Sequence, residues 1–301
     1  MADLLERARR LGHERFAAIA EQGEPGRLNR PLVKALGDER LLELVFAGSA
    51  VELCELREGL AHGCTEAETA LALQGLGGYP ILRNEVLRGE WIPRLAAGDA
   101  VAAFALSEPE SGSDVASLAL RAEPDGDGYR LTGEKTWISN APDADLYSVF
   151  ARTSEAGAKG ITAFAVPRES DGLSGEHLEL VAPHPVGRLD FDGVRVEADH
   201  VLGEVDGGFA VAMETLDLFR PSVGAFGVGM AQAALDAALS HTAARQAFGR
   251  PLSDFQAVSH RLAEMATRVQ AARLLVRDAA AQYDAGVRPV RKASAMAKLY
   301  A

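Results

Sequence analysis

The chain has 301 residues and is 48% hydrophobic, which is enough for a large core or for two to three subdomains. Its formal net charge of −12 and the absence of a Lys/Arg run argue against a nucleic-acid-binding surface. The only two cysteines, Cys54 and Cys64, provide no disulfide framework, so we predict a reduced, cytoplasmic protein.

The first hundred residues have the spacing of helices, with apolar residues three and four positions apart and charges between them. Helices are predicted at residues 1–20, 31–44, 50–60, 65–76 and 84–95. Residues 1–10 lack the apolar core of a signal peptide, and the uncharged stretches are too short to span a membrane. We predict an N-terminal helical domain at residues 1–98, without catalytic groups.

The middle of the chain changes to the two-residue period of strands. Strands are predicted at residues 101–106, 118–122, 129–132, 136–139, 146–151, 161–166 and 194–196, with turns at 154–160, 167–175 and 182–187. Residues 125–128, Asp-Gly-Asp-Gly, are a hairpin signal. We predict an antiparallel β domain at residues 99–205, folded as a small barrel.

Helical spacing returns in the last third of the chain, at residues 209–241, 251–286 and 289–301. Ser253 and Gln256 have the spacing of a capping box for the second of these helices. Its apolar residues form a seam typical of coiled coils, which needs a partner: Phe255, Val258, Leu262, Met265, Val269, Ala272, Val276 and Ala279. The fold class is therefore α+β, with a C-terminal helical domain at residues 206–301.

Two short motifs at predicted strand ends are candidates for ligand binding. Pro109 ends the first strand, and the small polar residues 111–114 after it expose backbone N–H groups and hydroxyls suited to a phosphate or a carbonyl. Trp137, with Ser139 two residues on, has the chemistry to cover and hydrogen-bond a flat heteroaromatic ring. Taken alone, the first motif would more often be a plain surface loop, and Trp137 would more often be an ordinary core aromatic.

Four motifs in the same order resemble the acyl-CoA dehydrogenase family. They are Ala-Leu-Ser-Glu-Pro at 105–109 with Gly-Ser-Asp at 112–114; Gly-Glu-Lys-Thr-Trp-Ile-Ser-Asn at 133–140; Phe191 with 194–196 and 201–203; and Arg-Gln-Ala-Phe-Gly at 245–249 with Phe255 and Gln256. They cover residues 96–301. The resemblance implies a helical domain, a β domain, and a C-terminal helical bundle that forms a homotetramer.

The resemblance also implies an activity in fatty acid metabolism. Family members use FAD to oxidise the Cα–Cβ bond of an acyl-CoA thioester: a carboxylate removes the α-proton, the flavin accepts the β-hydrogen as hydride, and the electrons pass to an electron-transfer flavoprotein.

Cofactor residues are implied position by position. Those near the flavin would be Phe104, Leu106, Ser107, Ser113, Trp137 and Ser139, with Arg245, Phe248 and Gln256 holding the diphosphate and adenine of a neighbouring subunit's FAD. Trp137 would stack by the ring, Ser139 would donate to its N5 edge, and Ser113 would meet the phosphates and the thioester's pantetheine arm. Ala247 departs from the family, which carries a polar residue there.

The resemblance places the substrate near Ser113, Leu216, Asp217 and Arg220. Asp217 and Arg220 share a helix face, so a solvated ion pair is the alternative interpretation. The position before Arg220, where some subfamilies carry the catalytic Glu, is Phe219, and no metal-ligand spacing is found among the histidines.

No catalytic base is assignable. Glu108 resembles a structural corner, and the family's Glu lies beyond Ala301, so we expect a C-terminally truncated form with little or no activity unaided. Two alternatives stay open: a non-catalytic partner subunit of a heteromer, and a related flavin oxidase acting on another carbon acid. Acyl chain length and the choice between dimer and tetramer are not determined by the sequence.

Overall fold

The computed structural model describes residues 2–182 and 184–301. Met1 and Pro183, which fall in the predicted first helix and the predicted turn at 182–187, lie outside the described residues. By contacts the chain forms two compact units. The helical unit comprises residues up to Ala18, Gly48–Glu68 and Asp217–Ala301, and the sheet unit comprises Ile19–Ala47 and Thr69–Leu216. The division into three domains at residues 98 and 205 stays a prediction.

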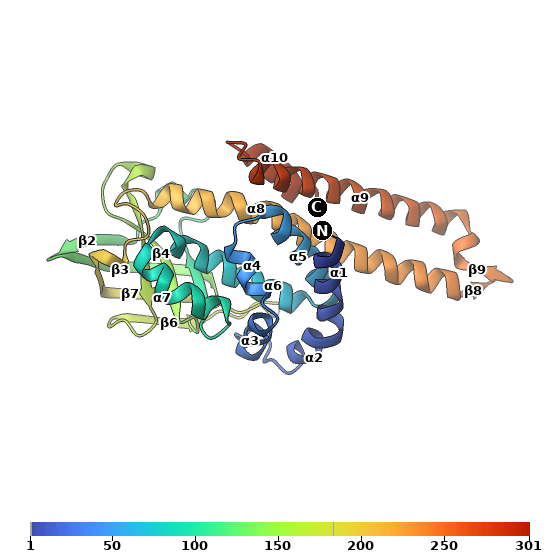
Figure 1. The fold of residues 1–301 in the computed structure, drawn as a ribbon, viewed down its shortest axis with the longest axis horizontal. Coiled ribbons are helices and arrows are strands. Elements are labelled where there is room, and N and C mark those ends of the chain that lie inside the picture. The colour runs from blue at the N-terminus through green and yellow to red at the C-terminus, as the bar shows by residue number, and fades with distance from the viewer. Residues whose placement is uncertain (1, 183) are drawn as a thin grey trace. The chain divides into compact units, whose positions relative to one another are not determined.

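The helical unit is built on α1, α5, α9, α10 and most of α8. Its elements are α1 (Ala2–Leu11), a π-helical turn (Gly12–Phe16), α5 (Ala50–Gly63), α8 (Gly208–Ala244, of which residues up to Leu216 belong to the sheet unit), the strands β8 (Gln246–Ala247) and β9 (Arg250–Pro251), a 3₁₀ turn (Leu252–Asp254), α9 (Gln256–Asp284) and α10 (Arg291–Tyr300). Figure 1 shows α8 and α9 side by side as a long helical hairpin with β8 and β9 at its tip.

Small residues bring α1 against α5. A Cβ added at Gly59 would lie 2.3 Å from the backbone oxygen of Leu5, so only glycine permits this approach. Cys54 and Cys64 are buried free thiols, as predicted. Burial raises the pKa of the Cys54 thiol to about 12 and that of Cys64 to about 11, which makes both unreactive near neutral pH.

The predicted start of α9 is wrong. The helix begins at Gln256, with Phe255 as its N-cap and no side-chain cap bond, and Ser253 lies in the preceding 3₁₀ turn. The capping box therefore does not form. Within the predicted seam, the C-terminal half is buried inside the chain: Val269, Ala272, Val276 and Ala279. The N-terminal half stays half-exposed: Phe255, Val258, Leu262 and Met265.

The sheet unit carries one large sheet with short helices. The helices are α3 (Arg30–Asp38), α4 (Leu41–Phe46), α7 (Glu85–Ala96), most of α6 (Thr65–Gly78) and the end of α2 (Ala17–Ala20), with 3₁₀ turns at Tyr79–Arg83, Val115–Ser117, Gly157–Gly160 and Ala198–His200. The strands are β1 (Ala102–Ala105), β2 (Arg121–Asp125), β3 (Gly128–Ser139), β4 (Leu146–Arg152), β5 (Ile161–Pro167), β6 (Leu173–His177) and β7 (Val186–Glu197).

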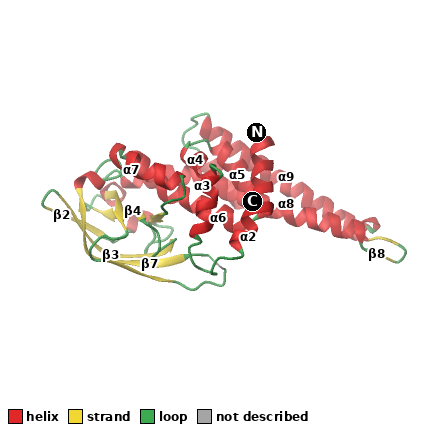
Figure 2. Cartoon of the chain, turned by 60° about the horizontal axis from the view of Figure 1, so that its bottom comes forward, coloured by secondary structure: helices red, strands yellow, loops and turns green. Residues whose placement is uncertain are grey.

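The strands form one sheet in the order β1-β4-β2-β3-β7-β6, with β5 also paired to β4. Figure 2 shows β2, β3, β4 and β7 in this curled sheet. The predicted antiparallel pairing holds for β2–β3, β3–β7, β4–β5 and β6–β7, whereas β1 and β2 both pair with β4 in parallel. The predicted β domain is a curled sheet, and among the described residues no strand ladder joins β6 back to β1 or β5. The predicted α+β class, with helices at both ends of the chain, is confirmed.

Three predicted strands change length or join. Residues 129–132 and 136–139 belong to the single strand β3, and β7 extends the short strand predicted at 194–196 back to Val186. β6 lies partly in the predicted turn at 167–175. The hairpin at 125–128 is confirmed, because Asp125 pairs with Gly128 across the two-residue turn.

The core of the sheet unit explains why β4 and β5 lack alternation. Six successive residues in each strand are buried, because both faces of these strands are covered. One face packs in a cluster with α7 and the start of α8, including Leu87, Trp91, Phe150, Ile161 and Val211.

By length and composition α8 is the one described helix that is apolar enough to cross a membrane. Core helices of soluble proteins pass the same test, and part of α8 is buried here. This is weak evidence, and the expectation of no membrane contact stays a prediction.

Candidate functional site

Trp137 stands in a bulge of β3. The register of β3 on β7 shifts between Lys135 and Ile138. Trp137 has φ 58° and is 59% exposed, whereas Lys135 and Ile138 on either side are buried. A bulky residue in the left-handed region costs about 1–2 kcal/mol, and an exposed indole contributes little burial. The structure therefore rules out the core-aromatic interpretation, and the Trp137 indole is exposed to solvent.

The chain after β1 lies beside this bulge. The backbone N–H of Thr136 donates to the carbonyl of Ser107 at 3.0 Å, which joins the two predicted ring-binding motifs. Phe104 is half-buried against Phe150, with ring centroids 4.9 Å apart, and Leu106 is buried. The sheet unit thus brings together the predicted ring-binding residues from both motifs.

A buried ion pair, which the sequence did not reveal, holds this junction. The Lys135 ammonium is fully buried and donates to Glu108 Oε1 at 2.7 Å and to the Leu106 carbonyl at 3.0 Å. Glu108 also accepts the backbone N–H groups of Ala119 and Leu120, at 2.5 and 3.0 Å. Its carboxylate is therefore committed to structure, as the corner interpretation predicted, and is not free to act as a base.

Burial of Lys135 shifts its titration. Desolvation lowers the pKa of Lys135 to about 8, and the nearby Glu108 offsets part of that shift. A buried ion pair of this kind locks two segments in register, because removing either partner leaves the other charge uncompensated.

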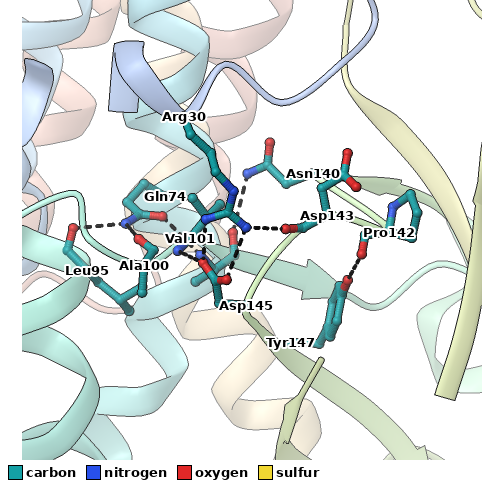
Figure 3. A network of polar contacts seen from close by, with 11 residues as sticks. Arg30, Gln74, Leu95, Ala100, Val101, Asn140, Pro142, Asp143, Asp145 and Tyr147 are labelled. Carbon is teal, nitrogen blue, oxygen red and sulfur yellow. Dashed lines mark hydrogen bonds and ion pairs between the residues drawn. The ribbon is translucent and has the colours of Figure 1, made fainter. Parts of the chain in front are cut away.

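A second polar network braces the end of β3 (Figure 3). Arg30 donates to both carboxylate oxygens of Asp145 at 2.8 and 3.0 Å and to the Asp143 carbonyl at 2.7 Å. Asp145 also accepts the Val101 N–H at 2.7 Å, at the start of β1. The guanidinium thereby ties the turn after β3 to β1, which carries the Ser107 motif.

Gln74 completes this network from α6. Its side chain is fully buried, donates to the carbonyls of Leu95 and Ala100 at 2.9 and 2.7 Å, and accepts the Ala102 N–H at 3.0 Å. All three partners are backbone groups where the chain reverses before β1. The Gln74 side chain therefore supplies the hydrogen bonds that these backbone groups need.

Replacing Gln74 with Leu is expected to lower the free energy of unfolding by about 2–4 kcal/mol, because three buried backbone groups lose their partner. Urea unfolding followed by circular dichroism measures the loss. Gln270→Leu, at an exposed position on α9, is the matched control and should change stability by less than about 0.5 kcal/mol. Equal effects of the two changes would contradict this role of Gln74.

Ser139 is hydrogen-bonded to a histidine. Its Oγ lies 2.9 Å from His184 Nε2, although the two residues are far apart in the sequence. Burial lowers the pKa of His184, so the imidazole is neutral near pH 7. No role for His184 was predicted, because it lies outside the recognised motifs.

The loop with Ser113 is open to solvent. Ser113 is exposed, and a Cβ at Gly112 would meet nothing within 4 Å. Neighbouring side chains shape the turn instead, with Ser111 Oγ donating to the Asp114 carbonyl at 2.7 Å. The loop leaves room for a polar ligand, and the role of Ser113 stays a prediction.

Three of the predicted substrate residues, Leu216, Asp217 and Arg220, lie on α8. Leu216 packs against the core of the sheet unit. In the helical unit, Arg220 Nη1 lies 3.4 Å from Asp217 Oδ1, and Arg291 Nε lies 3.8 Å from Asp217 Oδ2. The Asp217 side chain is only 12% exposed, so the pair is not fully solvated.

The hairpin tip of the helical unit presents the other predicted cofactor residues. Phe248 and Gly249 connect β8 and β9 with φ of 52° and 81°, the backbone of a tight hairpin turn that favours Asn and Gly. Phe248 is nevertheless 97% exposed. Arg245 and Gln256 are exposed at the same tip. The Phe248 ring gains little from burial in this turn, and its role in binding the cofactor stays a prediction.

We expect Phe248→Asn to weaken FAD retention about tenfold, from the loss of a stacking partner worth about 1–3 kcal/mol. The same change should leave the unfolding free energy unchanged or slightly raised, since Asn suits the turn. Fluorescence titration of the apoprotein with FAD, beside thermal unfolding, measures both. Phe248→Tyr keeps the ring and should bind as the parent does; full FAD affinity in Phe248→Asn would refute a cofactor role for this residue.

Two family models match the chain over most of its length. One, described as acyl-CoA dehydrogenase, middle domain, matches residues 103–194, and the other, acyl-CoA dehydrogenase, C-terminal domain, matches residues 206–301. A curated relative, cyclohexane-1-carbonyl-CoA dehydrogenase of Geobacter metallireducens, is 36% identical over 98% of this chain and 81% of its own length. The chain belongs to the acyl-CoA dehydrogenase family.

Solved structures of the family have the same fold. Butyryl-CoA dehydrogenase from Megasphaera elsdenii aligns with a TM-score of 0.88 at 31% identity, covering 99% of this chain and 83% of the other. A structure described as PigA with FAD and proline aligns with a TM-score of 0.90 at 25% identity, covering 99% and 82%. The chain is therefore an oxidoreductase of a flavoprotein family, in which FAD is the expected cofactor.

The residues present fit FAD in each unit considered by itself. In the sheet unit, an exposed indole stands among hydroxyl groups and a half-buried phenyl ring, which suits a flat heteroaromatic ring with polar edges. In the helical unit, the tip offers a guanidinium and an exposed phenyl ring, which suit a diphosphate and an adenine. The assignment of individual residues to FAD stays a prediction.

Proposed function

We propose that this chain binds FAD and an acyl-CoA thioester and serves in α,β-dehydrogenation of the thioester, with electrons leaving to an electron-transfer flavoprotein. The observation that carries the proposal is Trp137, held in a left-handed bulge, 59% exposed and joined to the Ser107 motif. FAD bound there would supply the hydride acceptor. Cytoplasmic location and a role in fatty acid metabolism are part of the same proposal.

The chain's own residues would bind FAD and the acyl-CoA and orient them. Trp137 would cover the ring, while Ser107 and Ser139 would hydrogen-bond its polar edges. The Glu108–Lys135 pair and the Arg30–Asp145 network hold these groups in place. Leu216, Asp217 and Arg220 would face the acyl-CoA.

Three observations bear on the choice of base. Glu108 is committed to Lys135 and two backbone N–H groups, and Phe219 is a buried aromatic. Glu214, a carboxylate on α8 more than a turn before Arg220, forms an ion pair with Arg83. These observations favour the second candidate function, a partner subunit that binds FAD or acyl-CoA while another chain supplies the base.

One experiment tests both candidates. The FAD-loaded chain is mixed anaerobically with a panel of saturated acyl-CoAs and the flavin band is followed. We expect FAD to be retained and its spectrum to change on acyl-CoA binding, with slow bleaching or none. Rapid bleaching would mean that a carboxylate of this chain is the base. A chain that neither retains FAD nor responds to any acyl-CoA would contradict the proposed function.

We also propose that the chain forms a dimer or tetramer. The first half of the α9 seam leaves four apolar side chains half-exposed, and Arg245 would reach a neighbouring subunit's FAD. Leu262→Glu is expected to shift the mass measured by light scattering from oligomer to monomer, because it places a charge in that seam. Leu274→Glu, at a position 57% exposed on the same helix, is the control and should leave the mass unchanged. A parent chain that is a stable, FAD-loaded monomer would refute the shared site.

A further inference from the structure

Ser139 and Trp137 both reach the surface near the end of β3. Trp137 is exposed and Ser139 is half-buried, whereas Ile138 between them is buried. Ser139 Oγ belongs to the residue two positions after the exposed Trp137, and His184 Nε2 lies 2.9 Å from it.

The backbone places His184 there. The N–H of Asn140, the residue after Ser139, donates to the Pro185 carbonyl at 2.9 Å, and the His184 N–H donates to Ala182 at 2.8 Å. The first bond holds the segment around His184 against the end of β3, and the second is internal to that segment. The contact between the hydroxyl and the imidazole is therefore supported by backbone pairing and does not depend on one side-chain bond.

Burial lowers the pKa of His184, and within the described part of the chain no charged side chain raises it. Two titratable groups of the adjoining segment are paired elsewhere, Glu179 with Arg27 at 3.1 Å and His177 with Asp143 at 3.5 Å. A neutral imidazole accepts a proton on one nitrogen and gives one from the other, and His184 is only partly buried, so solvent can reach it.

We propose that Ser139 and His184 form a hydroxyl–imidazole relay that moves a proton between the ring-binding face at Trp137 and solvent. In the outward direction, the Ser139 O–H proton passes to His184 Nε2 and the Nδ1 proton leaves to water. Ser139 Oγ then takes a proton from the group that it faces. One proton is transferred in all, and no electron.

The inference rests on the proposed function, since it needs a ligand that exchanges a proton at this face. FAD would supply such chemistry, because its return to the oxidised form after hydride acceptance releases a proton. His184 is a positioning and proton-carrying residue, and Ser139 is the group that would touch the cofactor.

The first test needs no cofactor. Histidine ring resonances of the protein are followed by nuclear magnetic resonance as a function of pH, in the parent and in Ser139→Ala. Loss of a bond worth about 1 kcal/mol should move the His184 midpoint by roughly half a pH unit or more, with His177 unmoved. An unmoved His184 midpoint would overturn the inference.

The second test measures whether proton transfer depends on His184. FAD-loaded protein is photoreduced, and its reoxidation by ferrocenium, an acceptor of electrons only, is timed across pH. The parent rate should follow the His184 titration. His184→Gln keeps a hydrogen-bonding side chain but cannot relay, and should lose this pH break and slow about tenfold at unchanged FAD content. His177→Gln is the control and should behave as the parent.

The outcomes separate the two proposals. A His184→Gln variant with the parent's rate and pH profile would overturn the relay and leave the proposed function standing. A parent chain that retains no FAD would contradict the proposed function, and the resonance test alone would then decide whether the Ser139–His184 pair exists.

Discussion

Lys135→Met is expected to lower the free energy of unfolding by about 3–5 kcal/mol. The change leaves the Glu108 carboxylate buried with two backbone N–H groups as its remaining partners, and an uncompensated buried charge is costly. Glu108→Gln should cost a similar amount, because it leaves the ammonium group of Lys135 buried without a counter-charge. Unfolding in guanidinium chloride, followed by a spectroscopic signal from the sheet unit, measures the loss of stability in both variants.

The double variant Lys135→Met/Glu108→Gln decides whether the two residues act as a pair. We expect its loss to be smaller than the sum of the single losses by at least about 2 kcal/mol, since neither charge is then left alone. The exposed pair Arg121–Glu155, at 3.4 Å, is the matched control, and its variants should change stability by less than about 1 kcal/mol. Additive losses at positions 108 and 135 would contradict a coupled pair.

The Glu108–Lys135 pair also predicts that the free energy of unfolding depends on pH. Burial lowers the pKa of Lys135 to about 8, below the value of about 10.4 for an unfolded lysine. Between these two pH values the unfolded chain binds more protons than the folded one, so the contribution of Lys135 to stability rises with pH. The difference in unfolding free energy between the parent and Lys135→Met should therefore grow from pH 8 to pH 10. A constant difference would mean that Lys135 titrates normally.

Trp137→Ala is expected to weaken FAD binding by about 30- to 100-fold, which corresponds to roughly 2–3 kcal/mol for an indole stacked on a flat ring. Alanine keeps a Cβ and therefore the same left-handed backbone strain, so the change isolates the indole. Because the side chain is 59% exposed, the unfolding free energy should change little.

Flavin content after gel filtration and the visible spectrum measure this loss. Trp137→Phe keeps an aromatic face and should retain most of the cofactor. If Trp137→Ala keeps the flavin content and spectrum of the parent, the ring does not lie on this indole, and the placement with Ser107 and Ser139 is wrong.

Local sequence patterns were sufficient to predict the fold class and the order of its elements along the chain. The continuous apolar runs of β4 and β5 and the glycine-rich turn at 125–128 are properties of consecutive residues, so they can be read from the chain. β6, Leu173–His177, could not be predicted, because its Ser-Gly-Glu centre is exposed and has no apolar alternation. Its conformation depends on pairing with β7.

The residues of the candidate site likewise divide into those that the sequence could predict and those that it could not. Motif order alone identified Ser107, Trp137 and Ser139, because the resemblance depends on residue types at fixed spacing. The sequence left open whether Trp137 was a core residue, since a bulge is a register mismatch between β3 and β7 and cannot be seen in one strand. The capping box at Ser253 failed for a similar reason, because the hairpin tip, and not the local spacing, sets where α9 begins.

What the sequence by itself determined is the family, the α+β class and the candidate cofactor residues, all carried by residues near one another in the chain. Only the tertiary structure decided that Lys135 is buried on Glu108, that Gln74 closes the reversal before β1, and that His184 meets Ser139. The physical reason is that burial and hydrogen bonding are properties of pairs. A lysine, a glutamine or a histidine has the same identity in the sequence whether it is solvated or desolvated, and only its distant partner determines which.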